Sequence, residues 1–277
     1  MNLSFLKMHG LCNDFVIIDN RADGFVPDSE TCKKIADRHI GVGCDQLIVL
    51  LKPTSPEADV TMRIINADGS EVGTCGNAAR CVGRLLFEET GRDKGVIQTK
   101  AGLLKVSAGT EGLIAVDFGT PWLKWDEIPL AQEVDTLKVP VSVGELANPC
   151  CVSMGNPHAV FFVPDADAVP LSTVGPKLET HAMFPQRCNI EAAHIIDREH
   201  IRMRVWERGT GITQACGSGA CATLVAAVRR GLSARRAVII LDGGELTIEW
   251  RESDSHVLMS GPAALAFKGE LAEEFTG

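Results

Sequence analysis

One pattern of residues occurs twice in the sequence, and this duplication constrains the fold more than any other feature. Met62 is followed thirteen positions later by Cys75, and Met203 is followed thirteen positions later by Cys216, so the two copies are 141 positions apart. The match continues in the same order, with Cys81 and Gly91 in the first copy and Cys221 and Gly231 in the second. Because a repeated unit folds in a similar way each time, the sequence predicts two similar halves.

Within each half, short β-branched runs between turn residues predict strands, among them NLSFLKM at 2–8, QLIVLL at 46–51 and AVIIL at 237–241. Helices are expected over 29–38, 77–90 and 218–230. The segment 218–230 is apolar nearly all round, which is typical of a helix enclosed by other elements. We therefore predict an α+β fold with two pseudo-symmetric lobes from an internal duplication, each a curved antiparallel or mixed sheet wrapped around a central helix.

The boundary between the lobes is expected where GTPW at 119–122 interrupts the strand pattern, which gives a first lobe over 1–118 and a second over 119–263. The length of 277 residues is sufficient for two modest domains.

Composition excludes several classes of protein. The net charge is −9 with no basic block, which argues against nucleic-acid binding and favours a small-molecule partner. The apolar runs are too short to cross a membrane, and the N-terminus has no secretory pattern, so a soluble cytoplasmic protein is expected. The ten cysteines include no CxxC pair, so we expect reduced thiols and no structural metal.

Cys75 and Cys216 each precede a glycine at the start of a predicted helix. A helix N-terminus lowers the pKa of a thiol and binds a carboxylate through its unpaired N–H groups. If the halves pack about a pseudo-twofold axis, the two thiols would face each other across a cleft. Such a pair of acid/base groups suits stereochemical inversion at one carbon, because one thiol removes a proton from one face and the other delivers a proton to the opposite face.

Other interpretations of these residues compete with a catalytic one. A single cysteine at a helix start is more often a small buried residue than a catalyst, and only the matching pair favours function. Cys81 and Cys221 are expected to be packing residues. Taken singly, five asparagines are turn or cap residues, and three of them gain weight because they adjoin the paired motifs: Asn13, Asn77 and Asn156, in contrast to Asn66 and Asn189.

Six motifs in order along the chain resemble those of the diaminopimelate epimerase family: HGLCNDF at 9–15, GVGCDQ at 41–46, NADGSEVGTCGNAARC at 66–81, GNPHAV at 155–160, ERGTGITQACGSGAC at 207–221 and SGPA at 260–263. The resemblance implies interconversion of LL- and meso-diaminopimelate in lysine and cell-wall precursor biosynthesis, with no pyridoxal phosphate, other cofactor or metal. It also implies a homodimer and a C-terminal strand, over 264–277, that returns to the first lobe.

The resemblance assigns roles to individual residues. The catalytic thiols correspond to Cys75 and Cys216, with Cys216 as proton acceptor and Cys75 as donor in the LL to meso direction, and His158 and Glu207 assist them. Arg208 is the candidate anchor for the distal carboxylate, and its alternative is a surface ion pair. The substrate contacts implied are Asn13, Gln46, Asn66, Gly76, Asn77, Asn156, Asn189, Glu207, Arg208, Gly217 and Ser218.

Three positions depart from the family pattern: Cys12 and Ala78 stand where glycine is usual, and Ser218 replaces threonine. Cys12 would be strained if its backbone needs an angle that only glycine adopts easily.

Three alternatives remain open at this point. They are a proline or hydroxyproline racemase with the same two thiols, a pyridoxal enzyme, and a non-enzymatic thiol switch in which Cys75 and Cys216 form a regulatory disulfide. We also predict that these two thiols oxidise to a disulfide when the site is empty, with activity lost in air and restored by reductant.

Overall fold

The computed structural model describes residues 3–24 and 26–275, and the chain forms two compact units. The first unit runs to Val116 and resumes at Gly261, and the second runs from Asp117 to Ser260. The sequence predicted the first boundary after residue 118, two residues later than observed. It predicted the second after residue 263, three residues later than observed. Residues 1–2, 25 and 276–277, which the expected lobes and the expected first strand include, lie outside the described residues.

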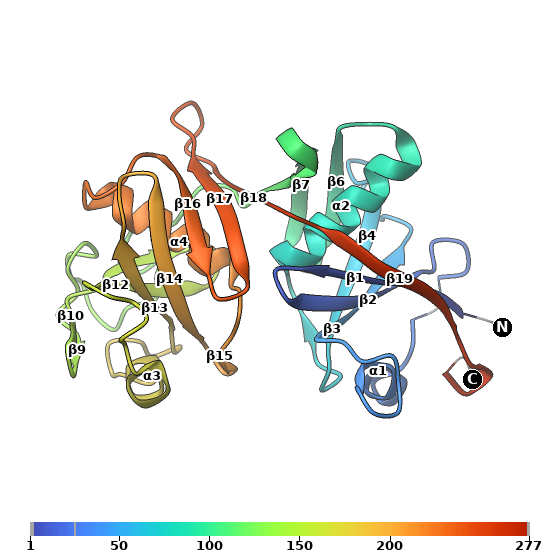
Figure 1. Ribbon diagram of the computed structural model, residues 1–277, viewed down its shortest axis with the longest axis horizontal. Coiled ribbons are helices and arrows are strands. Elements are labelled where there is room, and N and C mark those ends of the chain that lie inside the picture. The colour runs from blue at the N-terminus through green and yellow to red at the C-terminus, as the bar shows by residue number, and fades with distance from the viewer. Residues whose placement is uncertain (1–2, 25, 276–277) are drawn as a thin grey trace. The chain divides into compact units, whose positions relative to one another are not determined.

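The first unit is a mixed sheet with two helices (Figure 1). Its elements are β1 (Leu3–Gly10), β2 (Asn13–Asp19), α1 (Ser29–Ala36), β3 (Gln46–Leu51), β4 (Val60–Asn66), β5 (Glu71–Val72), α2 (Gly76–Thr90), β6 (Lys94–Thr99), β7 (Gly102–Ala108), η1 (Thr110–Gly112), β8 (Ile114–Asp117, at the boundary), β19 (Ala264–Leu271) and η2 (Glu273–Phe275). The late strand β19 lies antiparallel along β1, so the two ends of the sequence share one sheet (Figure 1).

The second unit contains a sheet of the same kind. Its elements are β9 (Ser142–Val143), β10 (Leu146–Ala147), β11 (Cys150–Ser153), β12 (Pro157–Phe162), α3 (Leu171–Glu179), β13 (Asn189–Ile195), β14 (His200–Glu207), β15 (Gly211–Ile212), α4 (Gly217–Arg229), β16 (Arg236–Leu241), β17 (Gly244–Trp250) and β18 (Val257–Gly261).

The strands of the two units pair in the same order. In the first unit β1–β2 is antiparallel, β2–β3 parallel, β3–β4 antiparallel, β4–β6 parallel and β6–β7 antiparallel. In the second unit the corresponding pairs, β11–β12, β12–β13, β13–β14, β14–β16 and β16–β17, have the same directions. Together with one enclosed helix in each unit, this repeated topology confirms the predicted α+β fold class.

The enclosed helices are α2 and α4, which begin one residue before the predicted starts. In α4 every residue from Gly219 to Ala227 is buried, as its nearly uniform apolar composition predicts. Helix α1 begins at Ser29 as predicted and ends at Ala36, two residues early. Its N-cap is Asp28, whose side chain accepts a hydrogen bond from the Thr31 N–H at 2.8 Å.

The helix α3 was not predicted, because its sequence LSTVGPKLE contains Gly175 and Pro176, which usually break a helix. Tertiary packing explains why it forms. Leu171, Val174 and Leu178 lie in a core cluster with the sheet, and a Cβ at Gly175 would lie 2.5 Å from the Trp206 ring. Glycine is therefore needed for this close approach of helix and strand.

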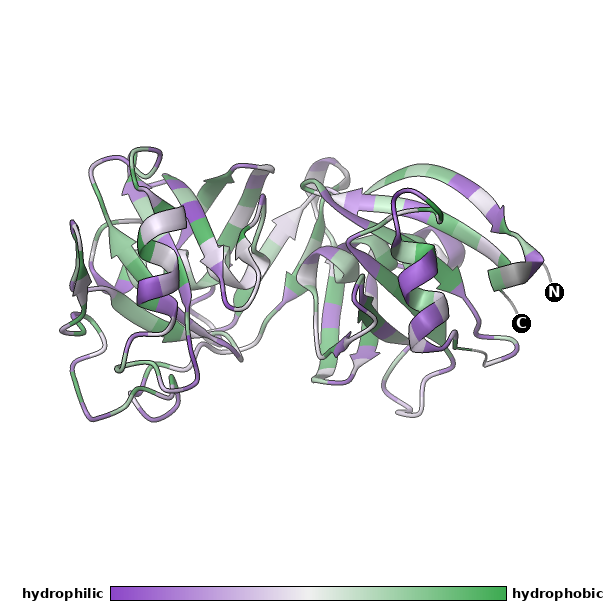
Figure 2. Ribbon diagram, turned by 90° about the horizontal axis from the view of Figure 1, so that it is seen from below, coloured by the Kyte–Doolittle hydropathy of each residue, from purple (hydrophilic) through white to green (hydrophobic). Residues whose placement is uncertain are grey.

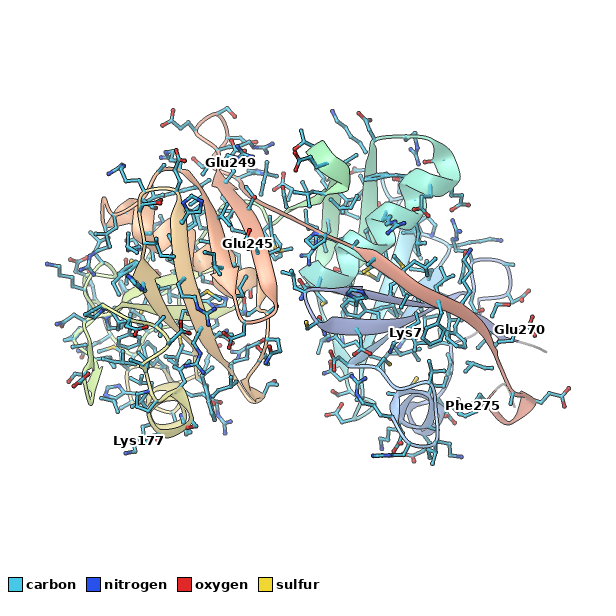
Figure 3. The ribbon with its side chains drawn as sticks, in the orientation of Figure 1. Lys7, Lys177, Glu245, Glu249, Glu270 and Phe275 are labelled. Atoms are coloured by element: carbon cyan, nitrogen blue, oxygen red, sulfur yellow. The ribbon has the colours of Figure 1, made fainter. Side chains whose placement is uncertain are left out.

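Alternation along the strands separates the core from the surface. In β17, Leu246 and Ile248 are buried, whereas Glu245 and Glu249 lie on the opposite face of the strand and are labelled in Figure 3. Figure 2 shows hydrophobic residues along the strands of each unit. Within the described part of the chain, no helix is both long and apolar enough to span a membrane.

Candidate active site

Cys216 is the N-cap residue of α4, directly before the first helical turn. Its Sγ accepts a hydrogen bond from the Gly219 N–H at 3.4 Å and lies 3.6 Å from Ser218 Oγ. A Cβ at Gly219 would lie 3.2 Å from this sulfur and 3.0 Å from Glu191 Oε1, so a larger residue there would press on both groups. The small residues after the cysteine therefore let the thiol and a carboxylate approach one helix end.

Two carboxylates, the buried Glu191 and the half-buried Glu207, lie beside Cys216. Burial raises the pKa of the Cys216 thiol well above its usual value, and the charges of Glu207 and Glu191 raise it further. Burial also raises the pKa of Glu207, although hydrogen bonds from Thr213 and from Cys216 oppose this rise. The sequence predicted that the helix N-terminus lowers the pKa of both thiols. For Cys216 this prediction is wrong, because burial and two carboxylates outweigh the effect of the helix end.

His158 and Glu191 form a buried pair in the same unit. His158 Nδ1 lies 2.6 Å from Glu191 Oε1, and both side chains have zero exposure. On the other side of the ring, Nε2 lies 3.1 Å from Asn156 Oδ1, and the Asn156 amide donates to Ser218 Oγ at 3.3 Å. The sequence-predicted residues Asn156, His158 and Ser218 thus belong to one connected group.

Glu191 was missed by the sequence reasoning. A signal was present, because Glu191 is the one charged residue at the start of β13, NIEAA, and its neighbours on both sides are apolar. Its counterpart in the first half of the duplication is Ile48, two residues after Gln46 as Glu191 is two after Asn189. Aligning the two halves would have shown a charge where the first half has isoleucine.

Cys75 is the N-cap residue of α2, with extended backbone angles (φ −150°, ψ 111°). Its thiol is half-buried and donates to Asn13 Oδ1 at 3.8 Å. The Asn77 amide donates to the same oxygen at 3.2 Å, and the Asn13 amide donates to Asp45 Oδ2 at 3.0 Å. Asn13, Cys75 and Asn77 are therefore brought together, as their positions beside the paired motifs suggested.

Gln46 and Asn66 are cross-strand partners on β3 and β4, and the Gln46 amide donates to Asn66 Oδ1 at 2.9 Å. Within the described residues, two buried acceptor atoms of this unit, Gln46 Oε1 and Asn77 Oδ1, have no hydrogen-bond partner. Such atoms are costly unless a ligand or water satisfies them.

Asp14, which follows Asn13 in the sequence, lies in a network of charged side chains. Asp14 accepts from the buried Lys7 at 2.5 Å and from Arg38 at 2.6 Å, and Lys7 also donates to the Gly43 carbonyl. Burial alone would raise the pKa of Asp14, but the hydrogen bonds from Arg38 and Lys7 hold it well below its usual range. Lys7 is labelled in Figure 3.

Asn189, the first residue of β13, lies beside Arg208, which follows the last residue of β14. Asn189 is buried, its amide donates to the Pro157 carbonyl at 2.9 Å, and its oxygen accepts from the Arg208 N–H at 2.9 Å. The Asn189 side chain thus connects two segments of the site through their backbone groups.

The Arg208 side chain is exposed and donates to the Gln186 carbonyl at 3.1 Å. It forms no ion pair with any described residue, so the surface ion pair considered from the sequence is not formed. It borders a pocket of about 650 Å³ in the second unit, lined also by Trp122, Asp126, Glu127, Pro129, Ser153, Gly155, Pro157 and Gln186.

The predicted strain at Cys12 is present. Leu11 and Cys12 form the two-residue turn between β1 and β2, and both have positive φ angles, 57° and 61°. This is the geometry of a hairpin turn that favours glycine or asparagine. Gly76 and Gly217 are the first residues of α2 and α4, so their N–H groups lie at the two helix starts.

Structures with this fold include proteins of different function. A phenazine biosynthesis protein of the PhzF family from Bacillus anthracis superposes with a TM-score of 0.68 at 19% identity, over 98% of this chain and 99% of that chain. A hydroxyproline epimerase from Agrobacterium vitis superposes with a TM-score of 0.68 at 13% identity, over 98% of this chain and 91% of that chain. These likenesses establish the fold.

Closer relatives establish the family. The sequence profile described as Diaminopimelate epimerase matches residues 5–124 and 150–266. The diaminopimelate epimerase of Rhodospirillum centenum is 58% identical over 97% of this chain and 92% of its own length. That of Acidiphilium cryptum is 54% identical over 96% of this chain and 95% of its own length. With its paired N-cap cysteines and this extent of identity, the chain belongs to the diaminopimelate epimerase family.

Proposed function

We propose that this chain is an isomerase that interconverts LL- and meso-2,6-diaminopimelate through two thiols and without a cofactor. The observation that carries the proposal is the placement of Cys75 and Cys216 as N-cap residues of equivalent helices in a duplicated topology. Membership of the family supplies the substrate, a small molecule with an amino acid group at each end. Inversion of one of its α-carbons requires that one proton is removed and another is added.

In the LL to meso direction Cys216 acts as the base. Glu207 accepts a hydrogen bond from Cys216 and is therefore placed to take the thiol proton. The resulting thiolate removes the α-proton of the substrate while the Cys75 thiol delivers its proton to the opposite face of the same carbon. Cys216 then holds the proton, Cys75 is the thiolate, and the reverse reaction exchanges these roles.

The two helix starts stabilise the carboxylate of the reacting end. The first N–H groups of α2 and α4 belong to Gly76, Asn77, Gly217 and Ser218, and such groups bind anions. Negative charge develops next to this carboxylate when the α-proton leaves, and fixed donors stabilise that charge without reorganisation.

The distal end of the substrate is held by polar side chains. Arg208 serves as its carboxylate anchor, since the guanidinium borders a pocket and has no ion-pair partner among the described residues. The unpartnered acceptors of Gln46 and Asn77 suit the ammonium groups. The other proposed contacts are Asn13, Asn66, Asn156 and Asn189.

We propose further that the two compact units act as lobes, that the protein is a homodimer and that it works in the cytoplasm. The dimer is supported by β19, a strand that exposes Leu265 and Phe267. The structure joins none of the ten cysteines in a disulfide, which suits a reducing compartment. Light scattering of the wild-type protein and of Phe267→Glu tests the dimer; a wild-type monomer would contradict it.

Proton NMR in D₂O tests the activity. The reduced protein should introduce deuterium at the α-carbon of LL-diaminopimelate and form the meso product, as measured by chiral chromatography. Cys75→Ala and Cys216→Ala should both lose this reaction, whereas Cys32→Ala, which changes a buried cysteine of α1, should keep it. Exchange with proline and not with diaminopimelate would indicate the racemase alternative, and no exchange with either would favour the thiol switch.

A further inference from the structure

The buried pair of His158 and Glu191 is the feature of the site that the proposed mechanism leaves unexplained. The two atoms facing each other, Nδ1 and Oε1, are 2.6 Å apart, and neither side chain is exposed to solvent. Removing a carboxylate from water is costly, and this cost can exceed the attraction of its buried partner. The presence of the Glu191 carboxylate in the protein interior therefore needs an explanation.

Glu191 lies on the face of β13 that is directed toward α4. Its neighbours Ile190 and Ala192 point the other way, into the core cluster that contains α3. The close approach of Glu191 Oε1 and Cys216 Sγ to the same Gly219 position places the carboxylate at the start of α4. The pair is therefore part of the surroundings of the thiol.

A chain of polar contacts connects the carboxylate to the thiol. It runs from Glu191 to His158 (2.6 Å), from His158 Nε2 to Asn156 (3.1 Å), from Asn156 to Ser218 (3.3 Å) and from Ser218 to Cys216 Sγ (3.6 Å). Because Glu191 occupies Nδ1, the nitrogen directed toward Asn156 and Ser218 is Nε2.

The first unit shows that the fold does not require this pair. The parallel register sets Phe15 opposite Gln46, and it sets His158 opposite Asn189 in the second unit. Phe15 and Ile48 therefore occupy the positions of His158 and Glu191, and both are fully buried. Since buried ion pairs are commonly replaced by apolar residues without loss of stability, the second unit retains its pair for another reason.

We propose that Glu191 is a positioning residue, which accepts the Nδ1 proton of His158 and so fixes the ring with Nε2 facing Asn156, whose amide in turn holds Ser218 beside Cys216. The proposal rests on the proposed function for its effect on rate, but the state of the ring is measured independently. The proton on Nδ1 stays between the ring and Glu191, so the pair acts on Cys216 through the placement of Asn156 and Ser218.

Two readouts test the proposal with ¹⁵N-histidine-labelled protein. In the wild type the His158 signals, assigned by their absence in His158→Phe, should show a protonated Nδ1 bonded to an acceptor. Glu191→Gln should change these signals and lower kcat about 100-fold, the cost of a small misplacement of a catalytic group, with KM changed less than threefold. Glu191→Asp, which keeps the carboxylate, should recover part of kcat.

Asp197→Asn is the matched control, because Asp197 pairs with Nδ1 of His200 on the exposed surface of the same unit. It should alter only the His200 signals and leave kcat unchanged. The double variant His158→Phe/Glu191→Ile copies the first unit and should fold with a melting temperature no lower than that of the wild type, while losing activity.

Three results would overturn the proposal: an unprotonated Nδ1 in the wild type, a kcat of Glu191→Gln within twofold of the wild type, or failure of the double variant to fold. Absence of exchange in the wild type would instead contradict the proposed function, and the histidine signals would still test the role of Glu191.

Discussion

The two units of this molecule surround their thiols with different chemistry on the same strand order. Cys75 is half-buried among amides, and its hydrogen-bond acceptor is Asn13. Cys216 is buried beside Glu207 and the His158–Glu191 pair. Duplication thus preserved the position of the thiol at the helix start, while the neighbouring side chains diverged. The two thiols are chemically distinct, since Cys216 lies beside two carboxylates of its own unit, whereas Cys75 donates to an amide oxygen.

The largest effect that would sharpen this comparison is expected for Glu207→Gln. The amide cannot accept the Cys216 proton, so kcat should fall by about 100-fold or more. The free energy of unfolding of this variant, in contrast, should rise. The pKa of Glu207 is raised above its ordinary value of 4.5, so the folded state binds more protons than the unfolded chain above pH 4.5 and loses stability as pH rises through the folded pKa.

The glutamine variant lacks this loss. Its free energy of unfolding should exceed that of the wild type at pH 7, and the difference should shrink as pH falls toward 4.5. Thermal unfolding at several pH values, together with the exchange assay, measures both effects. A glutamine variant that is less stable than the wild type at pH 7 would contradict the explanation that desolvation of the Glu207 carboxylate lowers stability.

In the first unit a carboxylate has the opposite effect on stability. The pKa of Asp14 is lowered by Arg38 and Lys7, so its charged form stabilises the folded state above pH 3.8 and this contribution is lost as pH falls through the folded pKa. Asp14→Asn leaves the buried Lys7 without its counter-charge and should lower the free energy of unfolding by about 3 kcal/mol at pH 7.

Urea unfolding at pH 7 and at pH 3 checks this prediction. The cost of the substitution should be smaller at pH 3. Asp59→Asn is the control, because Asp59 pairs with the more exposed Arg92 and should cost less. Equal costs at the two pH values would show that the charge of Asp14 is not the cause.

The smallest expected effect concerns the turn at Cys12. Cys12→Gly removes the strain of a positive φ and should raise the free energy of unfolding by about 1 kcal/mol, with activity unchanged. Glu111 also has a positive φ in an exposed turn, between β7 and β8, so Glu111→Gly is the matched change. A loss of activity in Cys12→Gly alone would assign the third thiol a part in the site.

Much of the fold was predictable because its signals are local. The helix starts at Cys75 and Cys216 follow from small residues and a repeated spacing, and the strands follow from β-branched runs. The helix α3 was missed because a local rule about Gly175 and Pro176 is overruled by packing against Trp206. The strand β11 was missed because its sequence CCVS has little strand character.

The candidate site divides in the same way. The sequence by itself determined the duplication, the two thiols at helix starts and the motifs that identify the family, because spacing and residue type are written along the chain. Only the tertiary structure decided that Cys216 is buried among carboxylates and that Glu191 pairs with His158, 33 positions earlier. Burial and cross-strand register arise from the packing of distant segments, and these two properties set the charge, orientation and proton affinity of the groups at the site.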